Sequence, residues 1–171
     1  MLVHGSLEHL ISNLVLQLVF GILLELSQGY RRVAVVHISS SLGGLILHLI
    51  QRPGRGLHGA SAAVFGLFAG NISSQILNWR DTESSLKNLY VFALLICTEV
   101  FFALNESVTG ISQAAHLGGG IVGFLIGIVV LEGTNNNLPK KILRCFCKIL
   151  SISLLIYSIY IIIEERRMIG I

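Results

Sequence analysis

Six apolar runs, each about as long as a membrane-spanning helix, constrain this chain more than any other feature. A helix that crosses a bilayer needs roughly 20 mostly apolar residues. The runs cover about residues 7–26, 33–50, 60–77, 88–104, 111–132 and 142–163. Because only helices and closed barrels satisfy the backbone inside lipid, the sequence predicts an all-α polytopic membrane protein. We expect about six transmembrane helices in one helical bundle.

The composition supports a membrane protein and excludes an ordinary water-soluble domain. Of 171 residues, 53% are apolar and 12% are charged, whereas a soluble domain has about 25% charged residues. The net charge is +3. The Lys and Arg residues are scattered through short loops and do not form one basic patch, which disfavours a nucleic-acid partner. The lipid bilayer is therefore the expected surrounding.

The Lys and Arg residues of the loops predict how the chain is oriented. One side of the predicted bundle carries eight of them: Arg31, Arg32, Arg80, Lys87, Lys140, Lys141, Arg144 and Lys148. The other side carries four: Arg52, Arg55, Arg166 and Arg167. The richer side is expected to be cytosolic. The first, third and fifth helices then begin in the outer half of the membrane.

Those three helix starts carry polar residues at a similar depth. His9 and Asn13 lie in the first helix, Gly59-Ala60-Ser61 opens the third, and His116 lies near the start of the fifth. A histidine inside a membrane helix is costly and is a functional candidate by default. A lone serine there usually bonds its own backbone. Four such residues at one depth favour a functional site.

Two stripes of small residues predict which helices pack together. The third helix carries Ala62, Gly66 and Gly70, and the fifth carries Gly119, Gly123 and Gly127. Small residues every four positions line one helix face and let two backbones approach closely. If the two stripes pack against each other, Ser61 and His116 lie close together. The alternative is that the glycines serve packing alone.

Ser61 and His116 have the chemistry of a nucleophile and its base. A serine hydroxyl needs a base within hydrogen-bond reach, and histidine is the commonest choice. Unpaired N–H groups at the start of the third helix could stabilise an oxyanion, and Gly59 permits the tight turn before them. His9 and Asn13 lie four residues apart, so they share a helix face as further donors. Zinc-type ligand spacing is missing, so no metal or cofactor is expected.

Three motifs in order resemble the rhomboid intramembrane serine proteases. The stretch from His4 to Asn13 resembles the family's second transmembrane helix. Gly59-Ala60-Ser61 resembles its Gly-x-Ser nucleophile motif, and Ala115-His116-Leu117-Gly118-Gly119 with Gly123 resembles its sixth-helix motif. The match runs from about residue 2 to 133, which would be the rhomboid catalytic domain. Residues 134–171 would then be a cytosolic loop and an extra C-terminal transmembrane helix.

The resemblance implies a serine endopeptidase that cleaves transmembrane segments of single-pass membrane proteins. Ser61 would be the nucleophile, His116 the general base, and His9, Asn13 and the Ser61 N–H the oxyanion hole. The supporting residues would be Gly59, Phe65, His4, Gly119 and Gly123. The extra helix implies a secretase-type member in the secretory pathway or plasma membrane rather than the mitochondrion.

The chain departs from the family pattern at three places. Phe65 stands where the family usually has a tyrosine stacked on the histidine, and Ala62 stands where it usually has glycine. We expect the methyl group of Ala62 to crowd the oxyanion site. The family's first helix and the long loop after it have no counterpart before residue 2. The main alternative is therefore a rhomboid-like protein that binds membrane clients without cutting them, and a transporter is a weaker one.

Several other residues are singled out. We expect a structural hydrogen bond from Glu99 in the fourth run, and packing or interfacial roles for His37 and His48 in the second. Asn105-Glu106-Ser107 is an N-glycosylation pattern on the predicted outer side. Cys145 and Cys147 lie among basic residues at the predicted cytosolic edge.

Overall fold

The structure, a computed structural model, describes residues 7–52, 54, 56–57, 59–78, 112–134 and 137–169. Its helices are α1 (Leu7–Gln28), α2 (Tyr30–Gln51), α3 (Ser61–Leu77), α6 (Gln113–Val130) and α7 (Leu138–Ile169). No strand occurs in these ranges, as the sequence predicts. The predicted fourth run, 88–104, lies outside the described residues. So do His4, Glu99 and the pattern at residues 105–107.

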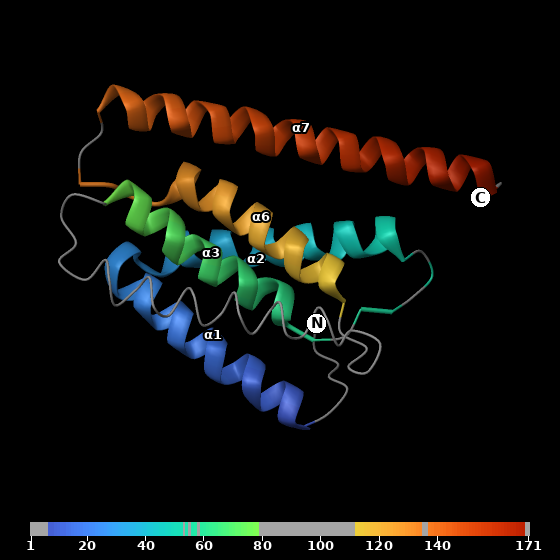
Figure 1. Ribbon diagram of the computed structural model, residues 1–171, viewed down its shortest axis with the longest axis horizontal. Coiled ribbons are helices and arrows are strands. Elements are labelled where there is room, and N and C mark those ends of the chain that lie inside the picture. The colour runs from blue at the N-terminus through green and yellow to red at the C-terminus, as the bar shows by residue number, and fades with distance from the viewer. Residues whose placement is uncertain are drawn as a thin grey trace.

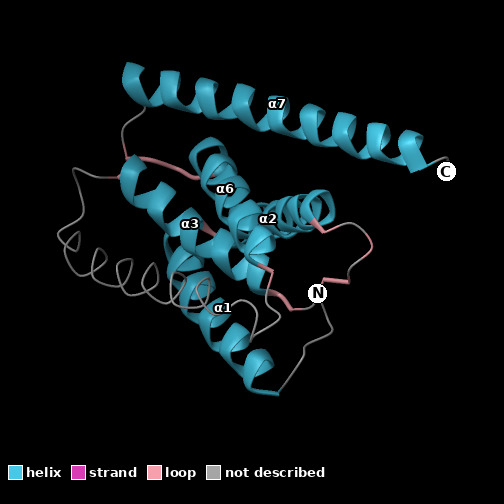
Figure 2. Cartoon of the chain, turned by 45° about the vertical axis from the view of Figure 1, so that its right-hand side comes forward, coloured by secondary structure: helices cyan, strands magenta, loops and turns pink. Residues whose placement is uncertain are grey.

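The helices form a bundle with α2, α3 and α6 at its centre. The helices α1, α3 and α6 run in one direction and α2 and α7 in the other (Figure 1). The turned view in Figure 2 shows α7 on one side of the bundle and α1 on the other. The predicted arrangement is confirmed in this respect, because the three helix starts that carry the candidate site residues lie at the same end.

The small-residue stripes of α3 and α6 pack against each other, as predicted. A methyl group on Gly123 would lie 2.5 Å from Gly66 Cα, and one on Gly127 would lie 3.3 Å from Gly70 Cα. Such distances leave no room for a side chain. The two backbones are therefore in direct contact along the stripes, which is how membrane helices gain packing energy without a hydrophobic driving force.

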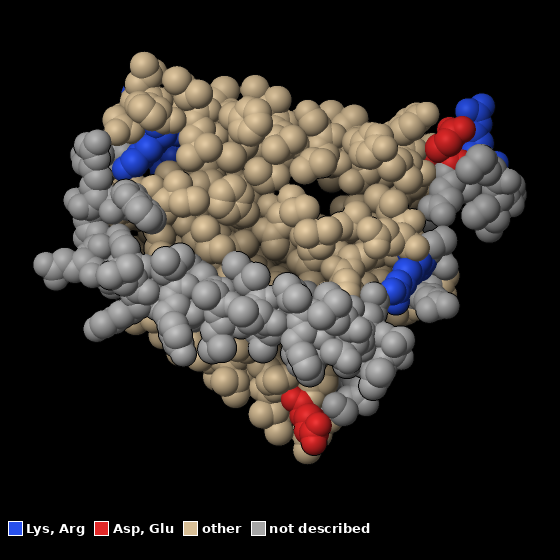
Figure 3. Space-filling view, viewed as in Figure 1, with Lys and Arg blue, Asp and Glu red and all other residues tan. Residues whose placement is uncertain are grey.

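The outer surface has the character of a protein embedded in lipid. Four of the described helices are long and apolar enough to cross a membrane, namely α1, α2, α6 and the first 27 residues of α7, while α3 is a shorter apolar helix of 17 residues. On the face drawn in Figure 3, the described Lys, Arg, Asp and Glu residues lie near the ends of the molecule, and the tan surface between them carries none of these four residue types. The aromatic residues Phe146, Tyr157 and Tyr160 of α7 are each about 60% exposed and face outward. The protein is thus an integral membrane protein.

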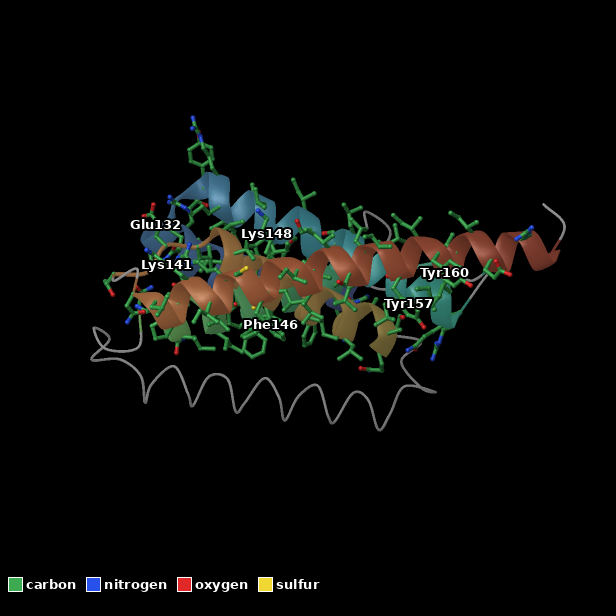
Figure 4. The ribbon with its side chains drawn as sticks, turned by 90° about the horizontal axis from the view of Figure 1, so that it is seen from above. Glu132, Lys141, Phe146, Lys148, Tyr157 and Tyr160 are labelled. Carbon is green, nitrogen blue, oxygen red and sulfur yellow. The ribbon has the colours of Figure 1, made fainter. Side chains whose placement is uncertain are left out.

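Polar contacts join the helix ends at the opposite side of the bundle from Ser61. Gln28 Nε2 donates to Ser74 Oγ at 3.1 Å, and Gln28 Oε1 accepts from Glu132 N–H at 2.7 Å. Arg32 forms an ion pair with Glu132. The view onto α7 in Figure 4 shows Glu132 and Lys141 at this end, while Tyr157 and Tyr160 lie towards the other.

Two boundaries differ from the sequence-based expectation. The apolar runs 7–26 and 33–50 predict a connector of several residues between the first two helices, but α1 ends at Gln28, α2 begins at Tyr30, and Gly29 alone forms the junction. Gly29 has φ 78°, which a glycine adopts without the strain of a side chain. The last helix runs from Leu138 to Ile169 rather than over 142–163. The apolar run predicts only the part that can lie in lipid, whereas the helix continues through the polar residues at both ends of that run.

Candidate active site

Ser61 and His116 are joined by a buried hydrogen bond. Ser61 is the first residue of α3, and His116 lies in the first turn of α6. His116 Nε2 lies 2.7 Å from Ser61 Oγ. The small-residue stripes of α3 and α6 pack against each other. This contact brings Ser61 and His116 together, as the four-residue spacing of the small residues predicts. This distance lies in the range that a serine nucleophile and its base require.

The ring of Phe65 lies flat against the imidazole of His116. The ring centroids are 4.4 Å apart and the planes are inclined by 18°. Phe65 is one helical turn after Ser61, so both residues reach His116 from the same face of α3. The phenyl ring therefore supplies the stacking surface that the family resemblance assigns to a tyrosine.

Gly59 brings α1 close to the start of α3. Its φ is 95°, a conformation in which a larger residue is strained. A methyl group at this position would also lie 2.8 Å from His9 Cε1 and 3.6 Å from Asn13 Nδ2. The turn before Ser61 thus packs directly against His9 and Asn13. Glycine is required at position 59 both by the positive φ and by the lack of space for a side chain.

The donors that could stabilise an oxyanion gather beside Ser61. The first intrahelical N–H donors of α3 are Ala63 and Val64, both bonded to the Ala60 carbonyl. The N–H groups of Ser61 and Ala62 precede them, at the positions that lack helical acceptors. Asn13 is buried, and its Nδ2 donates to the His9 carbonyl at 2.9 Å. The second N–H of this amide is a further donor on the side of Gly59.

The methyl group of Ala62 does not lie where we expected it. Ala62 is buried against α2, and its Cβ occupies the space that the absent side chain of Gly44 leaves. The expected crowding of the oxyanion site is a wrong prediction in this respect, because the methyl points to α2 while His9 and Asn13 belong to α1. Gly44 compensates for the departure at position 62.

Two contributors near the site were not identified from the sequence. Ser112 is the N-cap residue of α6, and its hydroxyl accepts from Ala115 N–H at 3.3 Å. Its signal was a serine directly before an apolar helical run, which is a typical N-cap position. Gly44 showed no signal, because its role depends on which helix packs against Ala62.

A cavity of about 700 Å³ lies beside the pair and is lined by Phe65 and His116. The rest of its wall is mainly apolar and includes Phe68, Ile72 and Phe124. The cavity therefore reaches the pair on the side of His116.

The fold and these contacts define a class of protein: a helical membrane protein with a buried serine–histidine pair at one end of its bundle. Comparison with known proteins is consistent with this class. The family model described as the Rhomboid domain matches residues 1–133. The chain belongs to this family.

Several curated relatives are about 30% identical to this chain over the residues that align. The mouse "Rhomboid-related protein 2" is 32% identical over 148 residues, covering 82% of this chain and 49% of its own length. The Arabidopsis thaliana "RHOMBOID-like protein 4" is 31% identical over 128 residues, covering 75% and 32%. The Arabidopsis thaliana "RHOMBOID-like protein 6, mitochondrial" is 30% identical over 131 residues, covering 77% and 42%. The chain thus spans a third to a half of the length of these relatives.

Proposed function

We propose that this protein is an intramembrane serine endopeptidase with a catalytic dyad of Ser61 and His116. The observation that carries the proposal is the 2.7 Å hydrogen bond between Ser61 Oγ and His116 Nε2. A buried serine in a membrane helix is otherwise expected to bond its own backbone. Ser73 of the same helix does so, by donating to the Ala69 carbonyl at 3.0 Å.

The dyad would act by acyl transfer. Ser61 Oγ attacks the carbonyl carbon of a peptide bond while His116 Nε2 takes its proton. The oxyanion of the tetrahedral intermediate is stabilised by the Ser61 N–H, Asn13 and His9. The intermediate collapses as His116 gives the proton to the leaving amine. Water then attacks the acyl-enzyme with His116 again as base, and Ser61 is regenerated.

The substrates that fit this site are single-pass membrane proteins. The dyad lies at one end of an apolar bundle, and the cavity beside it is mainly apolar. A transmembrane segment that unwinds near its end would present its backbone there. By the distribution of Lys and Arg we place this end on the non-cytosolic face, and we assign the protein to the secretory pathway or plasma membrane.

The test is labelling of Ser61 by a fluorophosphonate probe. The full chain should be labelled, whereas Ser61→Ala and His116→Ala should not, because one lacks the nucleophile and the other its base. The control is Ser73→Ala, which removes another buried serine hydroxyl of α3 and should keep labelling. Undiminished labelling of His116→Ala would exclude the dyad. A chain that is never labelled yet binds membrane clients would favour the non-cleaving alternative.

A further inference from the structure

A second buried serine–histidine hydrogen bond lies outside the proposed dyad. His48 Nδ1 and Ser112 Oγ are 2.7 Å apart, and the residues are 3% and 8% exposed. His48 is in the last turn of α2, and Ser112 is the N-cap residue of α6. Because the same hydroxyl accepts from Ala115 N–H, one side chain links the end of α2 to the first turn of α6.

That first turn of α6 carries the proposed general base. The His116 N–H donates to the Ser112 carbonyl at 3.3 Å, so the N-cap residue holds the amide of His116 as well as that of Ala115. On the same side, α2 touches the turn a second time: a methyl group on Gly44 would lie 2.6 Å from the Ala115 carbonyl oxygen. The position of His116 is therefore fixed from α2 as well as from α3.

The identity of residue 48 is unusual for its place in α2. Residues Val36, Ser40, Gly44 and His48 form a buried stripe at four-residue spacing. An apolar side chain would fill the last position of this stripe without a polar group to satisfy, whereas a buried imidazole is costly unless it is hydrogen-bonded. A buried histidine is tolerated when it is hydrogen-bonded, and one hydrogen bond of His48 goes to the cap of the helix that carries His116.

We propose that His48 is a positioning residue for the dyad. Through the Ser112 hydroxyl it holds the N-terminal turn of α6 in place, and this sets the imidazole of His116 within reach of Ser61. One consequence, a slower reaction of Ser61 when His48 is replaced, rests on the proposed function. The structural consequence, an ordered first turn of α6, can be measured independently of activity.

The experiment measures the rate and the saturation of Ser61 labelling by the fluorophosphonate in the full chain. His48→Leu and Ser112→Ala should each slow the labelling step by about tenfold to a hundredfold, as expected for a small misplacement of a reacting group. The probe concentration at half-saturation should change little. His48→Asn should restore most of the rate because its Oδ1 replaces Nδ1, and Ser112→Thr should do the same because it keeps the hydroxyl.

Ser73→Ala is the matched control for a merely structural effect. It removes a buried hydroxyl whose single hydrogen is shared between the Ala69 carbonyl of its own helix at 3.0 Å and the Phe124 carbonyl of α6 at 2.8 Å. We expect it to lower the thermal midpoint while leaving the labelling rate nearly unchanged. If His48→Leu lowers the midpoint by a similar amount and also leaves the rate unchanged, His48 only packs and the proposal is overturned.

Hydrogen exchange separates failure of this inference from failure of the proposed function. The amides of Ala115 and His116 should exchange faster in His48→Leu than in the unaltered chain or in Ser73→Ala. If the unaltered chain is not labelled at all, the proposed function fails, and exchange alone decides the positioning role. Equal exchange in all three proteins would refute it.

Discussion

Replacing Gly119 by alanine should separate the two residues of the dyad. A methyl group on Gly119 would lie 2.7 Å from the carbonyl carbon of Ala62 and closer still to its oxygen. An ordinary contact is at least 3.4 Å, so the backbones must move apart by about 0.7 Å or more. Because Ala62 directly follows Ser61, this movement acts on the proposed nucleophile itself.

The expected effect is large on labelling and moderate on stability. Overpacking of a tight contact costs roughly 1–3 kcal/mol, which should lower the thermal midpoint of the bundle without unfolding it. A shift of this size along the Ser61–His116 hydrogen bond of 2.7 Å would lengthen it beyond good hydrogen-bonding distance. Since a misplacement of about 1 Å costs about a hundredfold in rate, we expect the fluorophosphonate labelling of Ser61 to fall by about that factor.

Gly120→Ala provides the matched control. A methyl group at this neighbouring position would meet no atom of the described residues within 4 Å, so the same change of residue type should leave labelling and the thermal midpoint nearly unaltered. The assay measures labelling rates of both variants in detergent beside their thermal midpoints. Equal rates for Gly119→Ala and the unaltered chain would refute the reasoning, because the close backbone contact would then not position the dyad.

Three further results follow from described contacts. Phe65→Leu should reduce the labelling rate of Ser61 because it removes the ring stacked on His116, whereas Phe65→Tyr should keep the rate; equal rates would show that stacking is unimportant. Gln28→Ala should lower the free energy of unfolding by about 0.5–1.5 kcal/mol, measured by thermal denaturation, because it removes the side-chain acceptor of the Glu132 N–H. In a Cys97→Ser background, a membrane-impermeant thiol reagent should label the exposed Cys145 only after cells are permeabilised. Labelling of intact cells would invert the orientation.

The family and the candidate residues Ser61 and His116 could be predicted from the sequence because apolar runs and short motifs are local properties of the chain. Membrane helices satisfy their own backbone, so apolar run length predicts them directly, and four described helices of spanning length agree with that expectation. The stripes of small residues also predicted the correct partner helices. Two faces made of glycine and alanine let their backbones approach closely, and this brought Ser61 and His116 together.

Features of the site that depend on α2, in addition to α3 and α6, were decided by the tertiary structure. The direction of the Ala62 methyl, its accommodation by Gly44 and the bond between His48 and Ser112 all involve α2. No spacing along α3 or α6 contains that information. The rotation of α2 about its own axis follows from packing against both neighbours at once, and four-residue periodicity alone does not set it. The sequence therefore indicated which residues form the candidate site, whereas packing among three helices determined how they are held.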